Sequence, residues 1–364
     1  MAITVLQQPT SPNVTGTNLI YTVSSSNVPQ FQYRYVVDLY ESGSATRLTR
    51  FKYPQNSYGT CNVDLARPLD DYLDHDYNWK INNSSSFDNS VKTFTIQFGE
   101  EYGTSYSSSV TTFTNQASAS IEVFQGNVYP SEFTNGFNWT SQPILSNSPA
   151  TQSFNADDYL TVSVYDSDVS VKYYLTGSLT ATKNYVSTGS FSAIPISPLN
   201  IGLYSESDAI TLDVTGSSKR YELNNFCFNE KQRLAFTNKF GLWDYYNIYM
   251  PTLKSTNIDR KVYSRDRVNL NDRIATFNVS NRGDKQYYTE YTDTFEITTE
   301  TLSAKDSQWL VELFESDDVY IQSGSNFIPI NITNTQEQVI NNASRNPNFR
   351  YTIRYQFSNL REPR

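Results

Sequence analysis

Apolar and polar residues alternate along many short stretches of this chain, and turn residues separate the stretches. In FQYRYVVDLY, residues 31–40, Phe31, Tyr33 and Tyr35 fall on one face of a strand and the residues between them on the other. A period of two is typical of a half-buried strand, so the pattern predicts β structure. Strands are predicted at residues 19–23, 31–40, 46–53, 91–102, 120–126, 159–166, 169–176, 208–215, 221–229, 231–241, 245–250, 273–280, 286–299, 319–322, 327–333 and 349–357.

Two pairs of neighbouring strands are predicted to form hairpins. The strands at 159–166 and 169–176 flank Ser167 and Asp168, which suit a tight turn. The strands at 221–229 and 231–241 meet at Asn229 and Glu230. These two hairpins are the most local pairings that the pattern offers.

Two segments interrupt the strand pattern. The Ser/Thr-rich segment 105–120 is interpreted as a link between a first and a second β region. Residues 127–158 carry three prolines and no clear alternation. Because so long an irregular segment is unusual in a compact domain, it is either an interaction arm or a place where the strand pattern fails.

The C-terminal third contains one segment with a helical period, predicted as a helix over residues 302–316. Its apolar residues form a stripe at helical spacing, and a core-facing helix explains them. Ser303 suits the N-cap, with Asp306 three residues later. A shorter helical turn is predicted near Pro68. The stripe consists of Leu302, Trp309, Leu310, Leu313 and Phe314.

The composition supports the same fold class. Among 364 residues there are 28 Tyr and 21 Phe, and such residues favour pleated, half-buried surfaces. The chain is predicted to be all-β, mainly β with one clear C-terminal helix, and to form two or three β-sandwich-like or barrel-like domains. The predicted domains are residues 1–115, an acidic middle domain at 116–220, and 221–364.

The charge is distributed unevenly. The net charge of −9 disfavours nucleic acid as a partner. Residues 101–218 contain ten acidic and two basic side chains, whereas residues 226–290 contain eleven basic and seven acidic ones. Two regions of opposite charge on one chain suit head-to-tail packing of identical subunits. Chance clustering of charges on solvated surfaces is the equal alternative.

Residues suited to catalysis or metal binding are scarce. His75 is the single histidine and lies in an acidic segment, so it is interpreted as a surface residue. Cys61 and Cys227 are far apart and are predicted to be free thiols. One histidine and two isolated cysteines do not make a zinc site. We therefore expect no enzyme, no catalytic residues, no cofactor and no metal.

Two groups of aspartates are the best candidates for a calcium site, although neither has the spacing of an EF-hand loop. A solvated acidic loop is the favoured interpretation. The groups are Asp70, Asp71, Asp74 and Asp76, and Asp166 with Asp168.

The N-terminus lacks a charged segment followed by an apolar one, and no apolar run approaches 18 residues. We therefore expect no secretory signal and no membrane partner.

The aromatic stretch 226–250, FCFNEKQRLAFTNKFGLWDYYNIYM, is the candidate interaction site. Its corner at 238–244 breaks the strand alternation, so its apolar side chains do not all face one core. We expect part of the corner to contact a neighbouring subunit, with a local minicore as the equal alternative. Basic side chains interleaved with aspartates suit salt bridges between subunits. The predicted interface residues are Phe240, Leu242, Trp243, Tyr245, Arg260, Arg265 and Arg267.

Three passages resemble virion structural proteins of tailed phages, especially tail and neck components of phages that infect Bacteroidota or related marine bacteria. They are SPNVTGTNLIYTVSSSNVPQFQYRYVVDLYESGSATRL at 11–48, RLAFTNKFGLWDYYNIY at 233–249 and WLVELFESDDVYIQSGSNFIPINIT at 309–333, where Ile330 stands in place of the expected Val. The resemblance implies a virion location and a structural role. It implies a homo-oligomeric ring or tube in the tail, tail tip or neck, in contact with other virion proteins.

Three alternatives remain open. A carbohydrate- or receptor-binding module would use aromatics such as Trp79 and Trp139 to bind a host surface glycan. A capsid-associated structural protein would share the fold class but not the position in the particle. A glycosidase would need two carboxylates that face each other across a cleft.

Overall fold

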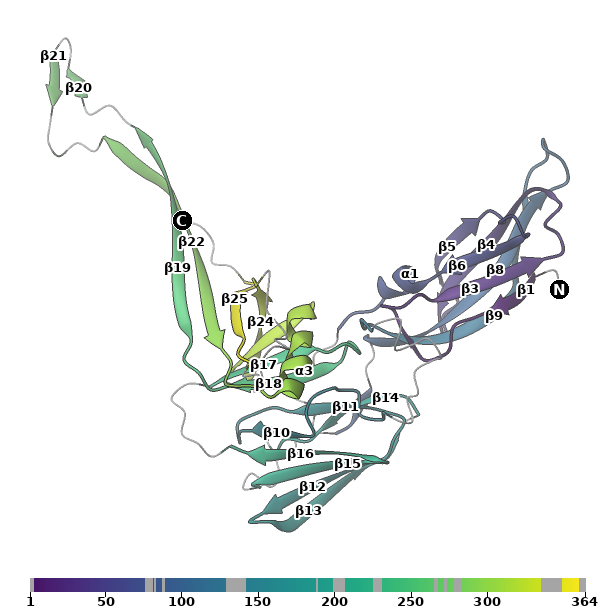
Figure 1. The fold of residues 1–364 in the computed structure, drawn as a ribbon. Helices are drawn as coiled ribbons and strands as arrows, with labels where there is room; N and C mark the ends of the chain where they lie inside the picture. The colour runs from purple at the N-terminus through teal and green to yellow at the C-terminus, as the bar shows by residue number, and fades with distance from the viewer. Residues whose placement is uncertain are drawn as a thin grey trace. The chain divides into compact units, whose positions relative to one another are not determined.

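A computed structural model of the chain describes residues 3–75, 81, 83–86, 89–128, 142–187, 189–198, 207–224, 231–264, 268–271, 274–277, 280, 283–334 and 349–359 (Figure 1). Strands account for 58% of these described residues and helices for 6%, which confirms the all-β fold class. The chain forms two compact units. The first comprises Met1–Asn225 with Phe236–Asp244, and the second comprises Phe226–Ala235 with Tyr245–Arg364.

The first unit begins with a sandwich of two sheets. A buried core that includes Tyr21, Tyr35 and Phe94 joins the inner faces of both sheets. Asp38 is buried on β4, where Arg50 of the neighbouring β5 holds it by two hydrogen bonds of 2.6 Å. One sheet contains β1 (Ile3–Gln7), β3 (Ile20–Ser25) and β6 (Thr60–Asp64), and the other, in order, β2 (Asn13–Val14), β9 (Thr111–Phe124), β8 (Val91–Gly103), β4 (Phe31–Glu41) and β5 (Arg47–Tyr53).

Two further sheets complete the first unit. The hydroxyl groups of Tyr173 and Tyr185, on strands of one sheet, donate to the carbonyl groups of Ile196 and Pro195 at the end of a strand of the other. The five-stranded sheet contains, in order, β10 (Thr151–Phe154), β16 (Ser217–Leu223), β15 (Ala209–Val214), β12 (Val169–Leu175) and β13 (Ser178–Tyr185). The three-stranded sheet contains β11 (Thr161–Tyr165), β14 (Phe191–Pro195) and β7 (Ser85–Ser86).

A seven-stranded sheet holds most of the described strands of the second unit, and the turn between β17 and β18 belongs to the first unit. Its order is β18 (Trp243–Ile248), β17 (Gln232–Thr237), β23 (Val319–Ser323), β24 (Asn326–Ile332), β25 (Thr352–Phe357), β22 (Asp284–Thr298) and β19 (Leu253–Ser264). Two short strands, β20 (Val268–Asn271) and β21 (Ile274–Phe277), pair with each other.

Both predicted helical segments are present. Helix α3 (Ala304–Glu315) begins after Ser303, whose hydroxyl accepts a hydrogen bond from the N–H of Asp306, and the Asp306 carboxylate accepts one from the N–H of Ser303. This capping box confirms the predicted N-cap. The short helix α1 (Ala66–Asp70) contains Pro68 in its first turn and buries Leu69.

Several predicted pairings and boundaries are wrong. β11 and β12 form no hairpin, because β11 pairs with β14 and β12 pairs with β13 and β15. The predicted hairpin at Asn229 and Glu230 falls on residues 225–230, which lie outside the described part, and the flanking strands β16 and β17 belong to different sheets.

The segment 105–120 is not a link, because β9 runs through it and pairs with β8 over most of its length. The predicted domain boundary at 115/116 therefore falls inside β9, and the boundary at 220/221 falls inside β16. The predicted strand at 91–102 corresponds to β8, which continues through an irregularity after Phe98 to Gly103. Of the segment 127–158, residues 151–154 form β10, which pairs in parallel with β16, and residues 129–141 lie outside the described part.

Candidate functional site: a two-stranded arm

The predicted interface corner is buried within the chain. Phe240 and Leu242 are no more than 1% exposed and pack in a core of the first unit with Phe124 and Phe191. Asn238 closes the turn, since its side-chain oxygen accepts hydrogen bonds from the N–H groups of Phe240 and Leu242. The local minicore that the sequence left as an alternative is therefore the arrangement in the structure.

Two more predicted interface residues are also buried. Trp243 is 6% exposed, and its ring lies 6.3 Å from the half-buried ring of His75. Tyr245, in the second unit, is 6% exposed and packs beneath the guanidinium group of Arg233 at 4.8 Å. Arg233 in turn donates to Asn247 at 2.8 Å. These contacts place both rings inside the chain and correct the prediction that they face another subunit.

The structure instead exposes a hairpin that the sequence pattern only half predicted. We call residues 255–264 of β19 and 284–294 of β22 the arm. The two strands pair from Ser255 and Thr294 to Ser264 and Asp284, with an irregularity at Lys261. β22 pairs with β25 only from Phe295 onward, so no described strand accompanies the arm (Figure 1). At about 3.3 Å per residue, the arm extends the sheet by roughly 30 Å.

The arm exposes apolar side chains to solvent. Every residue of β19 is exposed, and Ile258 and Val262 are 47% and 52% exposed. These two residues are four apart and therefore share one face of the strand, with Arg260 between them. Tyr291 lies opposite Ile258 in the register. We call this the apolar face of the arm; it is defined by Ile258, Arg260, Val262 and Tyr291.

The opposite face of the arm, which we call the polar face, carries charged side chains together with Tyr263, which is 42% exposed and whose ring lies 6.0 Å from that of Tyr287. Lys261 lies over the ring of Tyr288 at 4.9 Å, and the Tyr288 hydroxyl donates to Glu290 at 3.1 Å. Asn257 and Asp259 share this face. Of the predicted basic interface residues, Arg260 is exposed on the apolar face, whereas Arg265 and Arg267 lie outside the described residues. The role of all three in an interface stays a prediction.

A two-stranded ribbon of this kind has little to hold it together. An isolated hairpin in water is marginally stable because it has no core, and stability requires a third strand or a packed face. Within the described part of the chain, no third strand pairs with either edge of the arm, and an unpaired strand edge is a template for another strand. The arm thus has the two properties of a docking element, an apolar face and open edges.

The candidate chemical groups are held in structural contacts. The carboxylate of Glu100 is fully buried and accepts hydrogen bonds from Ser25, Asn27, Tyr33 and Gln116 at 2.6–3.1 Å. Four neutral donors around one carboxylate stabilise the charge and leave no room for a substrate at these atoms.

Several of the remaining candidates are also buried or hydrogen-bonded. Burial raises the pKa of the Cys61 thiol to about 11, so the nucleophilic thiolate is scarce at neutral pH. Asp166 and Asp168 both accept hydrogen bonds from Ser187, and Asp70 accepts one from the Thr15 hydroxyl at 2.6 Å. His75 is half-buried rather than at the surface as predicted. Cys227 and Asp76 lie outside the described residues.

Two kinds of feature are absent from the described residues. Within them, no three His, Cys, Asp or Glu side chains gather as metal ligands do. No helix in the same part of the chain has the length and apolar character needed to cross a membrane.

The fold and the site together define a mainly β chain of several sheets that carries a protruding two-stranded arm. Two comparisons with known proteins gave no match. No protein-family model matches the chain, and no curated protein matches it.

Proposed function

We propose that this chain is a non-enzymatic structural subunit that assembles with copies of itself through the arm. The observation that carries the proposal is the exposure of residues 255–264 of β19 in a ribbon that no described strand supports. Docking the apolar face on a neighbouring copy removes Ile258 and Val262 from water and supplies the packing that the ribbon lacks.

The charges favour a second copy as the partner. The apolar face carries Arg260, whereas residues 101–218, all in the first unit, contain ten acidic and two basic side chains. An arm that docks on the acidic region of the next copy makes a head-to-tail contact, and such contacts close into rings or stack into tubes. Together with the three passages that resemble tail and neck proteins of tailed phages, this supports a place in a virion.

A pair of charge reversals on opposite faces of the arm tests the proposal. Arg260→Glu is expected to weaken self-association about tenfold, since a like charge then faces the acidic region. Lys261→Glu makes the same change of charge on the polar face and is expected to alter it less than about twofold. The measurement is the mass of the purified full chain across a dilution series. Equal effects of the two variants, or a wild-type chain that stays monomeric at every concentration, contradict the proposal.

A further inference from the structure

An arm that docks on a neighbouring copy needs a receiving surface there, and the open strand edges of the first unit are the candidates. In the described part of this unit, three strands have an edge of seven or more residues that no other strand covers: β5, β9 and β13. β2 pairs with β9 only at Val123 and Phe124, so the edge of β9 is open over residues 111–121. Another strand can pair on such an edge.

Two of the three edges carry charges that oppose the addition of a strand. β5 has three basic residues, Arg47, Arg50 and Lys52, among its seven residues. On β13, Lys183 lies opposite the buried Val171 and therefore points to the inner face of an edge strand, which is one of the ways in which proteins prevent pairing there. The open edge of β9, TTFTNQASASI, contains neither a charged residue nor a proline. β9 is therefore the edge best suited to receive a strand.

The backbone groups of β9 that face the open edge follow from the hydrogen bonds at its end. The N–H group of Glu122 donates to the hydroxyl of Ser11 at 3.0 Å, so it points away from β8. In an antiparallel strand, residues at steps of two point their N–H and C=O groups to the same side. The pairing of β9 with β8 is regular over residues 117–124. The N–H and C=O groups of Ser118 and Ser120 therefore face the open edge.

The charges select β19 as the strand of the arm that pairs with β9. Residues 93–171, which include β9, contain eight acidic side chains and no basic one. In the arm, residues 255–264 of β19 contain two basic and one acidic side chain, whereas residues 284–294 of β22 contain one basic and three acidic ones. β19 is thus the strand whose charge is complementary to the region around β9.

A row of aromatic rings crosses the receiving sheet and ends at the open edge. The rings of Tyr33 on β4 and Tyr102 on β8 are 6.4 Å apart at 12°, and those of Tyr102 and Phe113 on β9 are 5.1 Å apart at 26°. Phe113 is 37% exposed, and a strand added beside β9 places a side chain next to its ring. These rings differ from Trp79 and Trp139, which the sequence assigned to a glycan and which lie outside the described residues.

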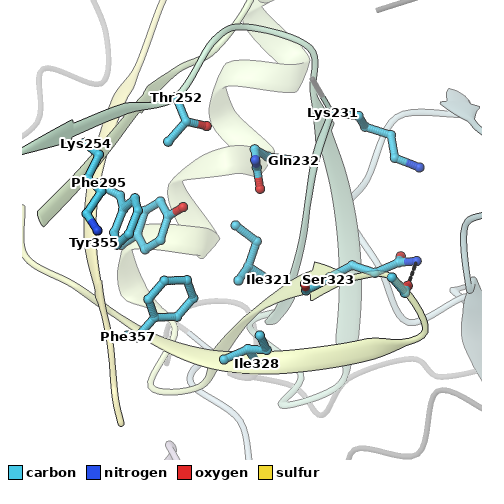
Figure 2. A pocket seen from close by; sticks show the side chains of 12 residues that line it. Lys231, Gln232, Thr252, Lys254, Phe295, Ile321, Ser323, Ile328, Tyr355 and Phe357 are labelled. Atoms are coloured by element: carbon cyan, nitrogen blue, oxygen red, sulfur yellow. Dashed lines mark hydrogen bonds between the residues drawn. The ribbon is translucent and has the colours of Figure 1, made fainter. Parts of the chain in front are cut away.

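The root of the arm is held to its own sheet. Phe295 stacks on Tyr355 with ring centroids 5.2 Å apart, and Phe357 packs edge-on against Phe295 at 5.1 Å (Figure 2). Lys254 of β19 lies over the ring of Phe295 at 5.4 Å and forms an ion pair with Asp293 of β22 at 2.7 Å. Because both strands are fixed where the arm begins, β19 loses less conformational entropy when it docks.

From these observations we infer that β19 of one copy adds to the open edge of β9 of the next copy, beside Ser118 and Ser120, and extends its five-stranded sheet. The inference rests on the proposed function and specifies the receiving surface of that contact. β9 belongs to the first unit and the arm to the second. Each copy therefore gives one strand and receives another, and the contact is head-to-tail.

A pair of substitutions at one position tests the inference. Ser118→Pro removes an N–H group that faces the open edge and leaves the hydrogen bonds to β8 in place. Self-association is expected to weaken at least about tenfold. Ser118→Ala keeps the N–H group and is expected to stay within about twofold of the wild type. The mass of each full chain across a dilution series measures this, and thermal unfolding of the two dilute variants within about 3 °C of each other establishes that the proline variant is folded.

Photo-crosslinking identifies the segment that lies beside Ser118. Ser118→benzoylphenylalanine places a reactive group about 5 Å from a side chain of the added strand. Isotope-labelled and unlabelled chains are mixed, concentrated and irradiated, and mass spectrometry is expected to find links from position 118 to residues 253–264 of a chain with the other label. Ser42→benzoylphenylalanine, at an exposed position after β4 in the same sheet, is expected to give no link to these residues.

The inference is overturned if Ser118→Pro associates like Ser118→Ala, or if the links from position 118 reach only other segments. If the chain still assembles in either case and Arg260→Glu still weakens assembly, the proposed function stands with a different receiving surface. A wild-type chain that stays monomeric at every concentration overturns the proposed function and the inference together.

Discussion

A variant without the arm is expected to stay a single chain in solution. In this variant, an Asn-Gly pair replaces residues 256–293, so that Ser255 and Thr294, which are paired in the register, are joined by a two-residue turn. The rest of the sheet keeps its strands, because β22 pairs with β25 from Phe295 onward. Self-association is expected to weaken at least about a hundredfold, since the change removes the whole contact rather than one side chain. The mass of the variant in a dilution series measures this.

The stability of the shortened chain provides the control. Because the arm adds no core, its removal is expected to change the midpoint of thermal unfolding of the dilute chain by no more than about 2 °C. A shortened chain that assembles like the wild type shows that the contact lies elsewhere. A shortened chain that unfolds much earlier shows that the arm supports its own unit instead.

The second large effect is expected at Gly241, in the buried corner of the first unit. Its φ of +70° lies in the left-handed region, and a Cβ atom there would lie 1.3 Å from the carbonyl oxygen of Gln125. No side-chain movement relieves a contact with backbone, so Gly241→Ala displaces the corner from the core that contains Phe240 and Leu242. We expect a loss of about 4 kcal/mol in the free energy of unfolding.

Gly216→Ala provides the matched control for this substitution. Gly216 lies in the same unit with a φ of +80°, and no heavy atom lies within 4 Å of the position of its added Cβ. Only the left-handed backbone then costs energy, about 1 kcal/mol. Urea unfolding followed by circular dichroism compares the two variants. If Gly241→Ala is no less stable than Gly216→Ala, the corner is not packed as the structure has it.

The strands and caps were predictable because their signals are local. Ser303 and Asp306 are three residues apart, and the alternation in FQYRYVVDLY lies within one strand. Which strands pair was not predictable in the same way. β12 pairs with β15 some forty residues later, and no feature of either strand identifies the other. The wrong hairpin, between β11 and β12, is a case in which the nearest strand in sequence was assumed to be the partner.

The sequence-based predictions for the arm and for the corner were wrong for different reasons. β19 has no buried face, so the apolar periodicity that reveals a strand is nearly absent from LKSTNIDRKVYS, and only Ile258 and Val262 hint at it. The corner has a clear turn signal in Asn238 and Gly241, but its burial depends on Phe124 and Phe191, which are distant in sequence. Apolar residues at a turn therefore suggested an interface between copies where the chain packs on itself.

Hydrogen exchange of the arm tests the assembly account most directly. Peptides from residues 253–264 and 284–294 can be followed by mass spectrometry in the concentrated wild-type chain and in the same chain diluted until its mass is that of one copy. The account predicts at least about tenfold slower exchange of the arm amides in the concentrated sample, because docking covers their open edges and apolar face. Arm exchange that is equally fast in both samples, while the chain is demonstrably assembled in one of them, contradicts it.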